Sequence, residues 1–310
     1  MKPFRPERLP TYPLVRRPSL VGLDDLSRPP AAGTTVARLL ADLPNVLQAR
    51  DFRQFLEALR SAKAKGKAMV WALGAHVIKT GLSPVVIDLM KRGWVSGLAF
   101  NGAGIIHDFE LALAGKTSED VGPRVRTGRF GMARETGEGL NEAIRKGAER
   151  GVGLGQAVGE MIARSTFPHK RLSLFAAAYR LGLPATVHVA VGTDIIHLHP
   201  RASGEAIGRT SLHDFFLLAA LVRRLDGGGV FLNVGSAVVL PEVFLKAVAL
   251  VRSQGLRLDG FTTAVFDFLR HYRPAENVVR RPHGKTGRGY YFVGPHEILI
   301  PLLAAALKRR

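Results

Sequence analysis

Residues 95–108 have the sequence VSGLAFNGAGIIHD. The apolar run at 95–100 predicts a strand that is buried on both faces, as strands of a parallel sheet are when helices cover each side. The apolar stretch at 105–114 predicts a helix. Between them lies a polar, glycine-rich turn made of Asn101, Gly102, Ala103 and Gly104. A strand, a tight turn and a helix in this order form the unit from which parallel α/β sheets are built.

The same alternation extends through most of the chain. Short apolar runs predict further strands at 68–73, 186–191, 230–232 and 260–264. Periodic or apolar segments predict helices at 35–64, 139–150, 173–181, 212–225, 241–253 and 296–308. The fold class is therefore α/β, with a doubly wound, mostly parallel sheet of the Rossmann-like type. We expect a single domain at 34–310, preceded by an N-terminal arm at 1–33 that is rich in Pro and Arg.

The composition excludes several classes of protein. The chain of 310 residues has no cysteine, so disulfides and thiolate chemistry are excluded. No apolar run approaches the roughly 20 residues of a membrane-spanning helix. Polar, Pro-rich sequence follows Lys2 and Arg5 where a signal peptide needs an apolar stretch. We therefore expect a cytoplasmic protein without a membrane partner.

The formal net charge of +19 raises the question of a nucleic-acid partner. The charge is spread over the chain, apart from clusters at 16–17, 270–288 and 308–310. The sequence contains no zinc finger, RNA-recognition aromatic motif or evident helix-turn-helix pattern. A solvated basic surface is the favoured interpretation, and nucleic acid is not an expected partner.

Polar residues and glycines follow every predicted strand. Ligands of open α/β sheets bind outside the carboxyl ends of the strands, so we expect these residues to converge on one crevice. They are His76 after the first strand; Asn101, Gly102, Ala103 and Gly104 after the second; Asp194, His197 and His199 after the third; Asn233, Gly235 and Ser236 after the fourth; and Thr262 and Thr263 at the fifth.

Two features near residue 102 have alternative interpretations. The Gly-x-Gly turn permits close approach of the backbone, and a helix start behind it can bind an anion such as pyrophosphate. The same residues also suit an ordinary strand-to-helix turn. His107 and Asp108 are expected in the first turn of the helix, where Asp suits the helix dipole and His is held neutral as a base.

The histidines also raise the question of a metal. Asp194, His197 and His199 lie close together in sequence, and on an extended stretch the two histidines share a face. With His76, His107 and His188 nearby, the ligand types are those that zinc and iron prefer. Their spacing matches no known ligand signature, so we expect no metal.

With these residues in view, the sequence resembles the deoxyhypusine synthase family. The similarity covers about residues 67–282 and is most distinctive at 76–120, 161–200 and 231–281. Residues 102–108 occupy the place of the family's Ala-Gly-Gly segment with its acidic residues. The resemblance implies a Rossmann-like domain that binds NAD, in tetramers with sites at dimer interfaces. It also implies oxidation of spermidine, followed by transfer of the aminobutyl group through an imine on a lysine.

The resemblance implies roles for particular residues. It matches Asp194 to an aspartate that binds the polyamine, and Glu276 to a glutamate near the reactive lysine. The positions that it places near the nicotinamide nucleotide are Asn101, Gly102, Ala103, Gly235 and Thr263.

The chain departs from the family where the reaction takes place. Arg280 and Arg281 stand where the nucleophilic lysine belongs, and arginine stays protonated and cannot form an imine. The nearest lysine, Lys285, is displaced into a glycine-rich turn. Apolar residues at 239–241 replace the family's catalytic histidine, its tryptophan is absent, and 106–107 replace one of its acidic residues. Fewer acids and more His and Arg favour an anionic ligand over a cationic polyamine.

The leading interpretation is a divergent, deoxyhypusine-synthase-like protein that binds NAD and catalyses a redox or group-transfer step on a small metabolite, but does not make deoxyhypusine. His107 would be the general base, Asp194 would orient the substrate, and His197 or His199 would be an auxiliary acid. Two alternatives stay open: a nucleotide-binding scaffold protein without turnover, and a metal-dependent hydrolase. We expect a small-molecule ligand and a homotetramer to which the arm contributes contacts.

Overall fold

The strands form a single parallel sheet in the computed structural model, which describes residues 1, 3–284 and 286–308. They are β1 (Met69–Leu73), β2 (Gly97–Asn101), β3 (Ala185–His188), β4 (Val230–Val234), β5 (Thr262–Asp267) and β6 (Arg288–Val293). The six strands have the order β3-β2-β1-β4-β5-β6, and every adjacent pair is parallel. The chain runs outward from β1 to β3 and then returns to β4 on the other side of β1. This confirms the predicted Rossmann-like, doubly wound fold.

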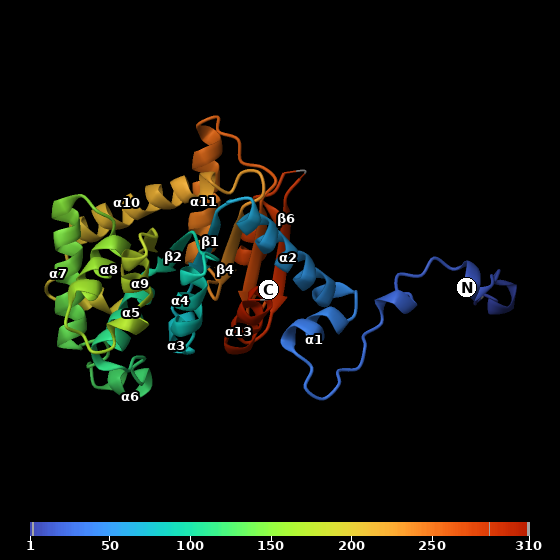
Figure 1. The fold of residues 1–310 in the computed structure, drawn as a ribbon, viewed down its shortest axis with the longest axis horizontal. Coiled ribbons are helices and arrows are strands. Elements are labelled where there is room, and N and C mark those ends of the chain that lie inside the picture. Colours follow the sequence, from blue (N-terminus) through green and yellow to red (C-terminus); the bar gives the residue numbers. More distant parts are fainter. Residues whose placement is uncertain (2, 285, 309–310) are drawn as a thin grey trace.

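Helices cover both faces of this sheet (Figure 1). They are α1 (Val36–Asp42), α2 (Leu47–Ala64), α3 (His76–Lys79), α4 (Ser83–Lys91), α5 (Gly102–Ala114), α6 (Val121–Arg126), α7 (Arg134–Arg150), α8 (Leu154–Arg164), α9 (Leu174–Arg180), α10 (Gly204–Arg223), α11 (Val239–Ser253), α12 (Tyr272–Pro274) and α13 (His296–Leu307). Two short elements matter for the site: the 3-10 helix η5 (Ile195–Leu198) and the π-helix η6 (Ala275–Arg280).

The alternation of side chains along the strands produces two separate hydrophobic cores. Trp71 and Phe100 belong to the larger core, which also takes side chains from α2, α4, α5, α8, α9 and α13. Val70 and Phe231 point to the other face and pack against α10, α11 and η6. All five residues of β1 are buried because both cores meet at this central strand. The continuous apolar runs of the sequence follow from this burial on two sides.

The prediction of one helix at 35–64 is wrong in one respect, because the structure has two helices there. It breaks between Asp42 and Leu47, around Pro44. Proline lacks a backbone N–H and pushes the preceding residue out of the helical region. Leu43 accordingly is extended, with φ −61° and ψ 152°.

The end of the sheet also differs from the prediction. The fifth strand continues to Asp267 and is not the last, because β6 pairs with it in parallel. The helix predicted at 212–225 begins earlier, at Gly204, where the Ser203 hydroxyl accepts a hydrogen bond from the backbone N–H of Ala206. Such a cap satisfies one of the free N–H groups at a helix start.

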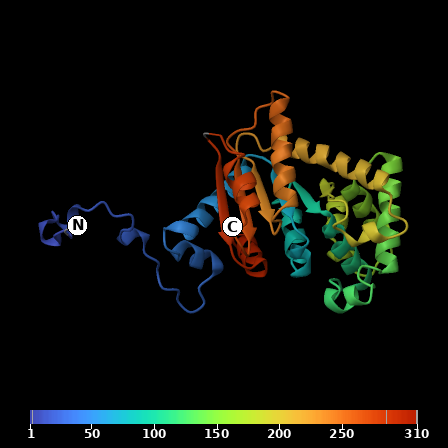
Figure 2. The same cartoon turned by 180° about the vertical axis from the view of Figure 1, so that it is seen from behind.

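The N-terminal arm extends away from the sheet and its helices (Figures 1 and 2). It contains ten of the large apolar side chains that are exposed, from Met1 to Leu26. Its connection to the rest runs through its last residues: Asn45 N donates to Asp25 O, and Arg28 N donates to Asp42 O, each at 2.9 Å. Among the described residues, no helix has the length and apolar character needed to cross a membrane.

Candidate functional site

At the centre of the sheet, two glycine turns pack main chain against main chain. Gly74 follows β1 and its N–H donates to Val234 O at 2.8 Å; Gly235 follows β4 and has φ +65°. A Cβ atom on Gly74 would lie only 2.0 Å from Gly235 O. No side chain can therefore lie between these turns. The strand order reverses between β1 and β4, and sheets of this type bind ligands at that point. We call the main chain of the two turns the floor of this expected site.

At the end of β2, each glycine of the Gly-x-Gly turn has a packing role. A Cβ atom on Gly102 would lie 1.9 Å from Asp194 Oδ2, and one on Gly104 would lie 2.6 Å from the Phe100 ring. Ala103 lies between them and is half-buried. The Asp194 carboxylate thus occupies the N-terminal end of α5, where the helix dipole favours a negative group. A phosphate at this turn would meet a carboxylate, so the structure argues against the anion site considered from the sequence.

Asp194 and His197 form a buried pair with unused hydrogen-bonding capacity. Their side chains are 5% and 7% exposed, and Asp194 Oδ2 lies 4.0 Å from His197 Nε2. Neither atom has a hydrogen-bond partner among the described residues. His197 Nδ1 accepts from the N–H groups of Gly192 (3.1 Å) and Asp194 (3.3 Å), so the ring proton is on Nε2 and faces the carboxylate. Burial raises the pKa of Asp194 to about 6 and lowers the pKa of His197.

His199 does not share a face with His197, contrary to the expectation for an extended stretch. Residues 195–198 form the 3-10 helix η5, so the two rings diverge. His199 packs against Gly137 of α7, where a Cβ atom would lie 2.3 Å from its Cδ2, and its Nδ1 accepts from Arg201 N at 3.2 Å.

His107 lies beyond the first turn of its helix, because α5 already begins at Gly102. Its Nδ1 is 2.7 Å from the Thr117 hydroxyl, which donates to Glu110 at 2.6 Å. Since the single hydroxyl proton goes to Glu110, His107 Nδ1 is the donor and Nε2 carries a free lone pair. The pKa of His107 is lowered to about 4 by burial and by Lys79. The ring is thus neutral, as predicted, but not because of the helix N-terminus.

Asp108, expected to interact with the dipole of its own helix, instead caps another one. Its buried carboxylate accepts from the Ser173 hydroxyl, from Leu174 N at 2.7 Å and from Phe175 N at 3.3 Å. These groups form the start of α9, so Asp108 holds α9 against α5.

A second group of polar residues surrounds the turns after β1 and β4. His76 is exposed and its ring centroid lies 5.3 Å from that of His296, at the start of α13. His296 is buried against Gly235; its Nε2 is 3.2 Å from Phe266 O, and its Nδ1 has no partner among the described residues. Asn233 donates to Ser236 O at 2.9 Å, which leaves its buried Oδ1 unpartnered in the same residue range.

His296 is not among the site residues predicted from the sequence, because residues 288–293 were not recognised as a strand of the sheet. The signal was present: a polar residue follows the apolar stretch 290–293, as at the other strand ends. Asp267 was missed for a related reason, since the predicted fifth strand ended too early. His271 Nε2 lies 3.8 Å from its Oδ1.

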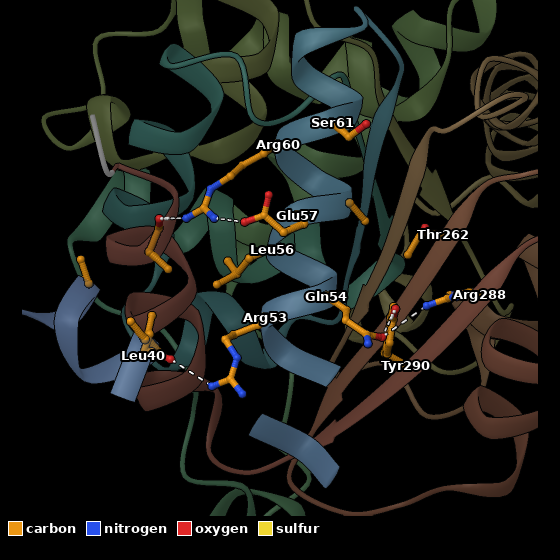
Figure 3. Close-up of a pocket in the computed structure, with 14 residues that line it drawn as sticks. Leu40, Arg53, Gln54, Leu56, Glu57, Arg60, Ser61, Thr262, Arg288 and Tyr290 are labelled. Atoms are coloured by element: carbon orange, nitrogen blue, oxygen red, sulfur yellow. Dashed lines mark hydrogen bonds and ion pairs between the residues drawn. The ribbon is translucent and has the colours of Figure 1, made fainter. Parts of the chain in front are cut away.

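Thr262 and Thr263 do not follow a strand, contrary to the expectation. They begin β5, at the amino end of the sheet, away from the turns after β1, β2 and β4. The Thr263 hydroxyl donates to Val278 O at 2.6 Å and contacts His283 Nε2 at 2.8 Å. Thr262 lines a cavity of about 590 Å³ between α1, α2 and β6 (Figure 3).

The polar groups of the Figure 3 cavity largely bond to one another. Gln54 Oε1 accepts from Tyr290 at 3.2 Å and from Arg288 at 3.4 Å. Arg60 pairs with Glu57 and donates to Ala306 O at 3.0 Å, while Arg53 donates to carbonyl groups at the end of α1. These contacts join α2 to its neighbours, and they leave this cavity a weaker candidate site than the carboxyl edge of the sheet.

Glu276 lies in η6, which runs back along the sheet beside β5 and β6. It pairs with Arg280 (Nε to Oε2, 2.7 Å) and with Arg281 (3.5 Å), so both arginines neutralise it. These ion pairs lower the pKa of Glu276. Lys285 lies outside the described residues.

The five histidines and aspartate considered as metal ligands do not gather in one place. His188 bonds to Thr186, His199 packs on α7, and His107 bonds to Thr117. Among residues 1, 3–284 and 286–308, no group of three or more His, Asp or Glu side chains is arranged to hold a metal ion. The metal-dependent hydrolase gains no support from this geometry.

No family model and no curated protein matches this sequence. Among solved structures, AgrE in a ternary complex with ornithine and NAD⁺ is 17% identical, with a TM-score of 0.54, over 86% of this chain and 34% of AgrE. A conserved putative LOR/SDH protein from Methanococcus maripaludis S2 is 16% identical, with a TM-score of 0.51, over 84% of this chain and 68% of the other. A putative deoxyhypusine synthase from Entamoeba histolytica is 10% identical, with a TM-score of 0.49.

The likeness is one of fold. The chain spans about a third of AgrE, and at these identities the solved structures identify the architecture and no activity. The Entamoeba structure is too distant to support the deoxyhypusine synthase resemblance, which remains an inference from the sequence. The ornithine and NAD⁺ of the ternary complex are ligands of AgrE itself.

Proposed function

We propose that this chain is an NAD-binding enzyme that acts on a small metabolite through a hydroxyl or amino group held by Asp194. The observation that carries the proposal is a pair of buried atoms at the glycine start of α5, Asp194 Oδ2 and His197 Nε2, for which the described part of the chain offers no hydrogen-bond partner. Buried polar atoms of this kind are costly unless a ligand or water satisfies them. A hydroxyl group suits both, because it can donate to the carboxylate and accept from the imidazole N–H.

In this proposal Asp194 is the general base. Its pKa, raised to about 6 by burial, makes it a better base than an ordinary aspartate while leaving it ionised at pH 7. His197 Nδ1 already accepts two backbone N–H groups, so the ring cannot easily take the proton there. Its part would be to donate a hydrogen bond from Nε2 to the substrate oxygen, which differs from the auxiliary acid expected from the sequence.

His107 is the alternative base. Its free Nε2 and neutral ring suit the task, and Glu110 and Thr117 fix its orientation. It lies five residues after Gly102, or about 7.5 Å further along the helix axis. It is therefore further than Asp194 from the glycine turn at the start of α5. The two candidates differ in pKa, about 6 against about 4, and a pH profile distinguishes them.

Support for NAD comes from the turns after β1 and β4. In this proposal the dinucleotide lies across the carboxyl ends of β1 and β4, beside the glycine turns at Gly74 and Gly235, where ligands of such sheets bind. Asn233 Oδ1 and His296 Nδ1 are buried acceptors near these turns that find no partner within residues 1, 3–284 and 286–308. The carboxamide of nicotinamide is a donor that could satisfy one of them. His76, Asn101, Ala103 and Ser236 would complete the contacts, whereas Gly104 is buried against the Phe100 ring. NAD, when bound, would accept or return a hydride.

The first experiment measures NAD⁺ binding by calorimetry and identifies any copurifying ligand by mass spectrometry of the denatured protein. Gly235→Ala places a Cβ atom 2.8 Å from His296 Cε1 at the proposed floor, whereas Gly255→Ala has a similar φ, +72° against +65°, and open space around it. We expect NAD⁺ affinity to fall at least about tenfold in Gly235→Ala and to stay unchanged in Gly255→Ala. Wild-type protein that binds no NAD⁺, or two variants that bind equally, would contradict the proposal.

The second experiment tests turnover. Wild-type protein with NAD⁺ is incubated with a panel of small hydroxy and amino compounds, and the absorbance of reduced nicotinamide is followed. Asp194→Asn should lower kcat by about 10²- to 10⁴-fold, while His199→Asn, whose ring faces α7, should retain activity. NAD⁺ binding without turnover on any compound would favour the scaffold alternative.

A further inference from the structure

The outward face of α10 carries a line of exposed side chains that nothing in the described residues covers. Leu212 is 55% exposed and Phe216 is 54% exposed, near the middle of this 20-residue helix. Glu205 and Arg223 are exposed near its two ends. At about 100° per residue, these four side chains lie within about 20° of one line along the helix. The opposite face packs on α7, α11 and β3.

The order of these residues is self-complementary. Leu212 follows Glu205 by seven residues, and Phe216 follows Leu212 by four. Arg223 follows Phe216 by seven, so the four positions are symmetric about position 214. If a second copy of the helix runs antiparallel with a two-fold axis at this position, Leu212 meets the partner's Phe216 and Glu205 meets the partner's Arg223. The charge pair and the apolar pair each form twice, as an isologous contact requires.

We propose that α10 is a homodimer interface in which two copies of this helix pack antiparallel about a two-fold axis at position 214. Exposed Leu and Phe side chains in a continuous line are unfavourable in water, and their burial against a second copy removes that cost. The opposite charges at the ends fix the antiparallel register and disfavour the parallel one, which would place Glu205 beside Glu205 and Arg223 beside Arg223 of the partner subunit.

The position of α10 is compatible with such a contact. Figures 1 and 2 both show the helix at the periphery, between α7 and α11 and far from the N-terminal arm. The small residues Gly208 and Ala220 are also exposed and flank the line, so two backbones can approach closely there. The interface is independent of the arm, and deletion of residues 1–21 should leave it intact.

The decisive experiment is a charge swap, read by sedimentation velocity of the full chain at micromolar concentrations. Glu205→Arg and Arg223→Glu should each weaken the association about tenfold, because each variant replaces two attractive pairs with two repulsive ones. The double variant should restore the wild-type dissociation constant. Leu212→Glu should abolish the dimer, and its melting temperature should equal that of wild-type protein diluted until it is monomeric, since the side chain is exposed in the single chain.

Crosslinking provides a second measurement, because the chain has no cysteine. A single cysteine in place of His213, beside the proposed axis, should link two copies with a short bis-maleimide. Gln254→Cys, exposed beyond the end of α11, should not. A monomeric wild-type chain, a double variant that stays as weak as the single ones, or an assembly that is lost with residues 1–21 and not with Leu212→Glu would each overturn the proposal.

Discussion

Replacing Gly102 with alanine tests the contact on which the candidate site depends. The φ angle of Gly102 lies outside the left-handed region, so the backbone itself accepts alanine. The added Cβ atom, however, would lie 1.9 Å from Asp194 Oδ2, and the carboxylate must move by more than 1 Å to restore an ordinary contact. Forcing an atom into a packed position costs about 1–3 kcal/mol, so we expect the free energy of unfolding to fall by that amount.

The assay is urea denaturation of four proteins that form a double-mutant cycle. In the Asp194→Ala background the obstacle is absent, and Gly102→Ala should be neutral or slightly stabilising, with a coupling energy of about 1 kcal/mol or more between the two sites. Gly204→Ala is the matched control, because Gly204 also begins a helix but has open space around it. If Gly102→Ala is as harmless as Gly204→Ala in both backgrounds, the carboxylate is not at the start of α5.

Three further predictions follow from the same geometry. If Asp194 is the base, kcat/KM should rise with pH through a midpoint near 6, because the ionised carboxylate is the active form; a midpoint near 4 would assign the step to His107 instead. Asp108→Ala should lower the free energy of unfolding by about 3 kcal/mol, measured by urea denaturation, because it leaves buried N–H donors at the start of α9 unpaired; a loss below about 1 kcal/mol would show that these donors find other partners. His296→Phe keeps a buried ring but removes the acceptor at Nδ1, so calorimetry should show weaker NAD⁺ binding, and unchanged binding would exclude that contact.

The sheet could be predicted from the sequence because its strands are buried on both faces. The run at 68–73 matches β1, and the turn at Asn101 marks the end of β2. The sixth strand was harder to identify, because Arg288 and Gly289 begin it with residues that do not form an apolar run. The break at Pro44 had a visible cause, but the apolar periodicity of the flanking segments concealed it.

The site could be predicted only where a residue follows a strand directly. Asn101 ends β2 and Gly235 follows β4, as expected, and their part in a site stays a prediction. The contact between Asp194 and Gly102 depends on the path of the chain from α5 through α9 to β3 and beyond, which no local sequence pattern indicates. The position of the proton on His197 depends on two backbone N–H groups in its own loop. The directions of the His197 and His199 side chains depend on the 3-10 helix at 195–198, which the residue types do not predict.

The contact between Gly74 and Gly235 has a consequence for motion. It joins the two halves of the sheet through main-chain atoms, and a hydrogen bond from Gly74 N to Val234 O reinforces it. If β1 and β4 slid past each other, the main-chain contacts between Gly74 and Gly235 would break. Glycine has no side chain that could change rotamer to restore them. Closure over a ligand must therefore come from the outer parts, the loop that carries Asp194 on one side and the start of α13 on the other. We therefore expect the amides of Gly74 and Gly235 to be among the slowest to exchange with solvent.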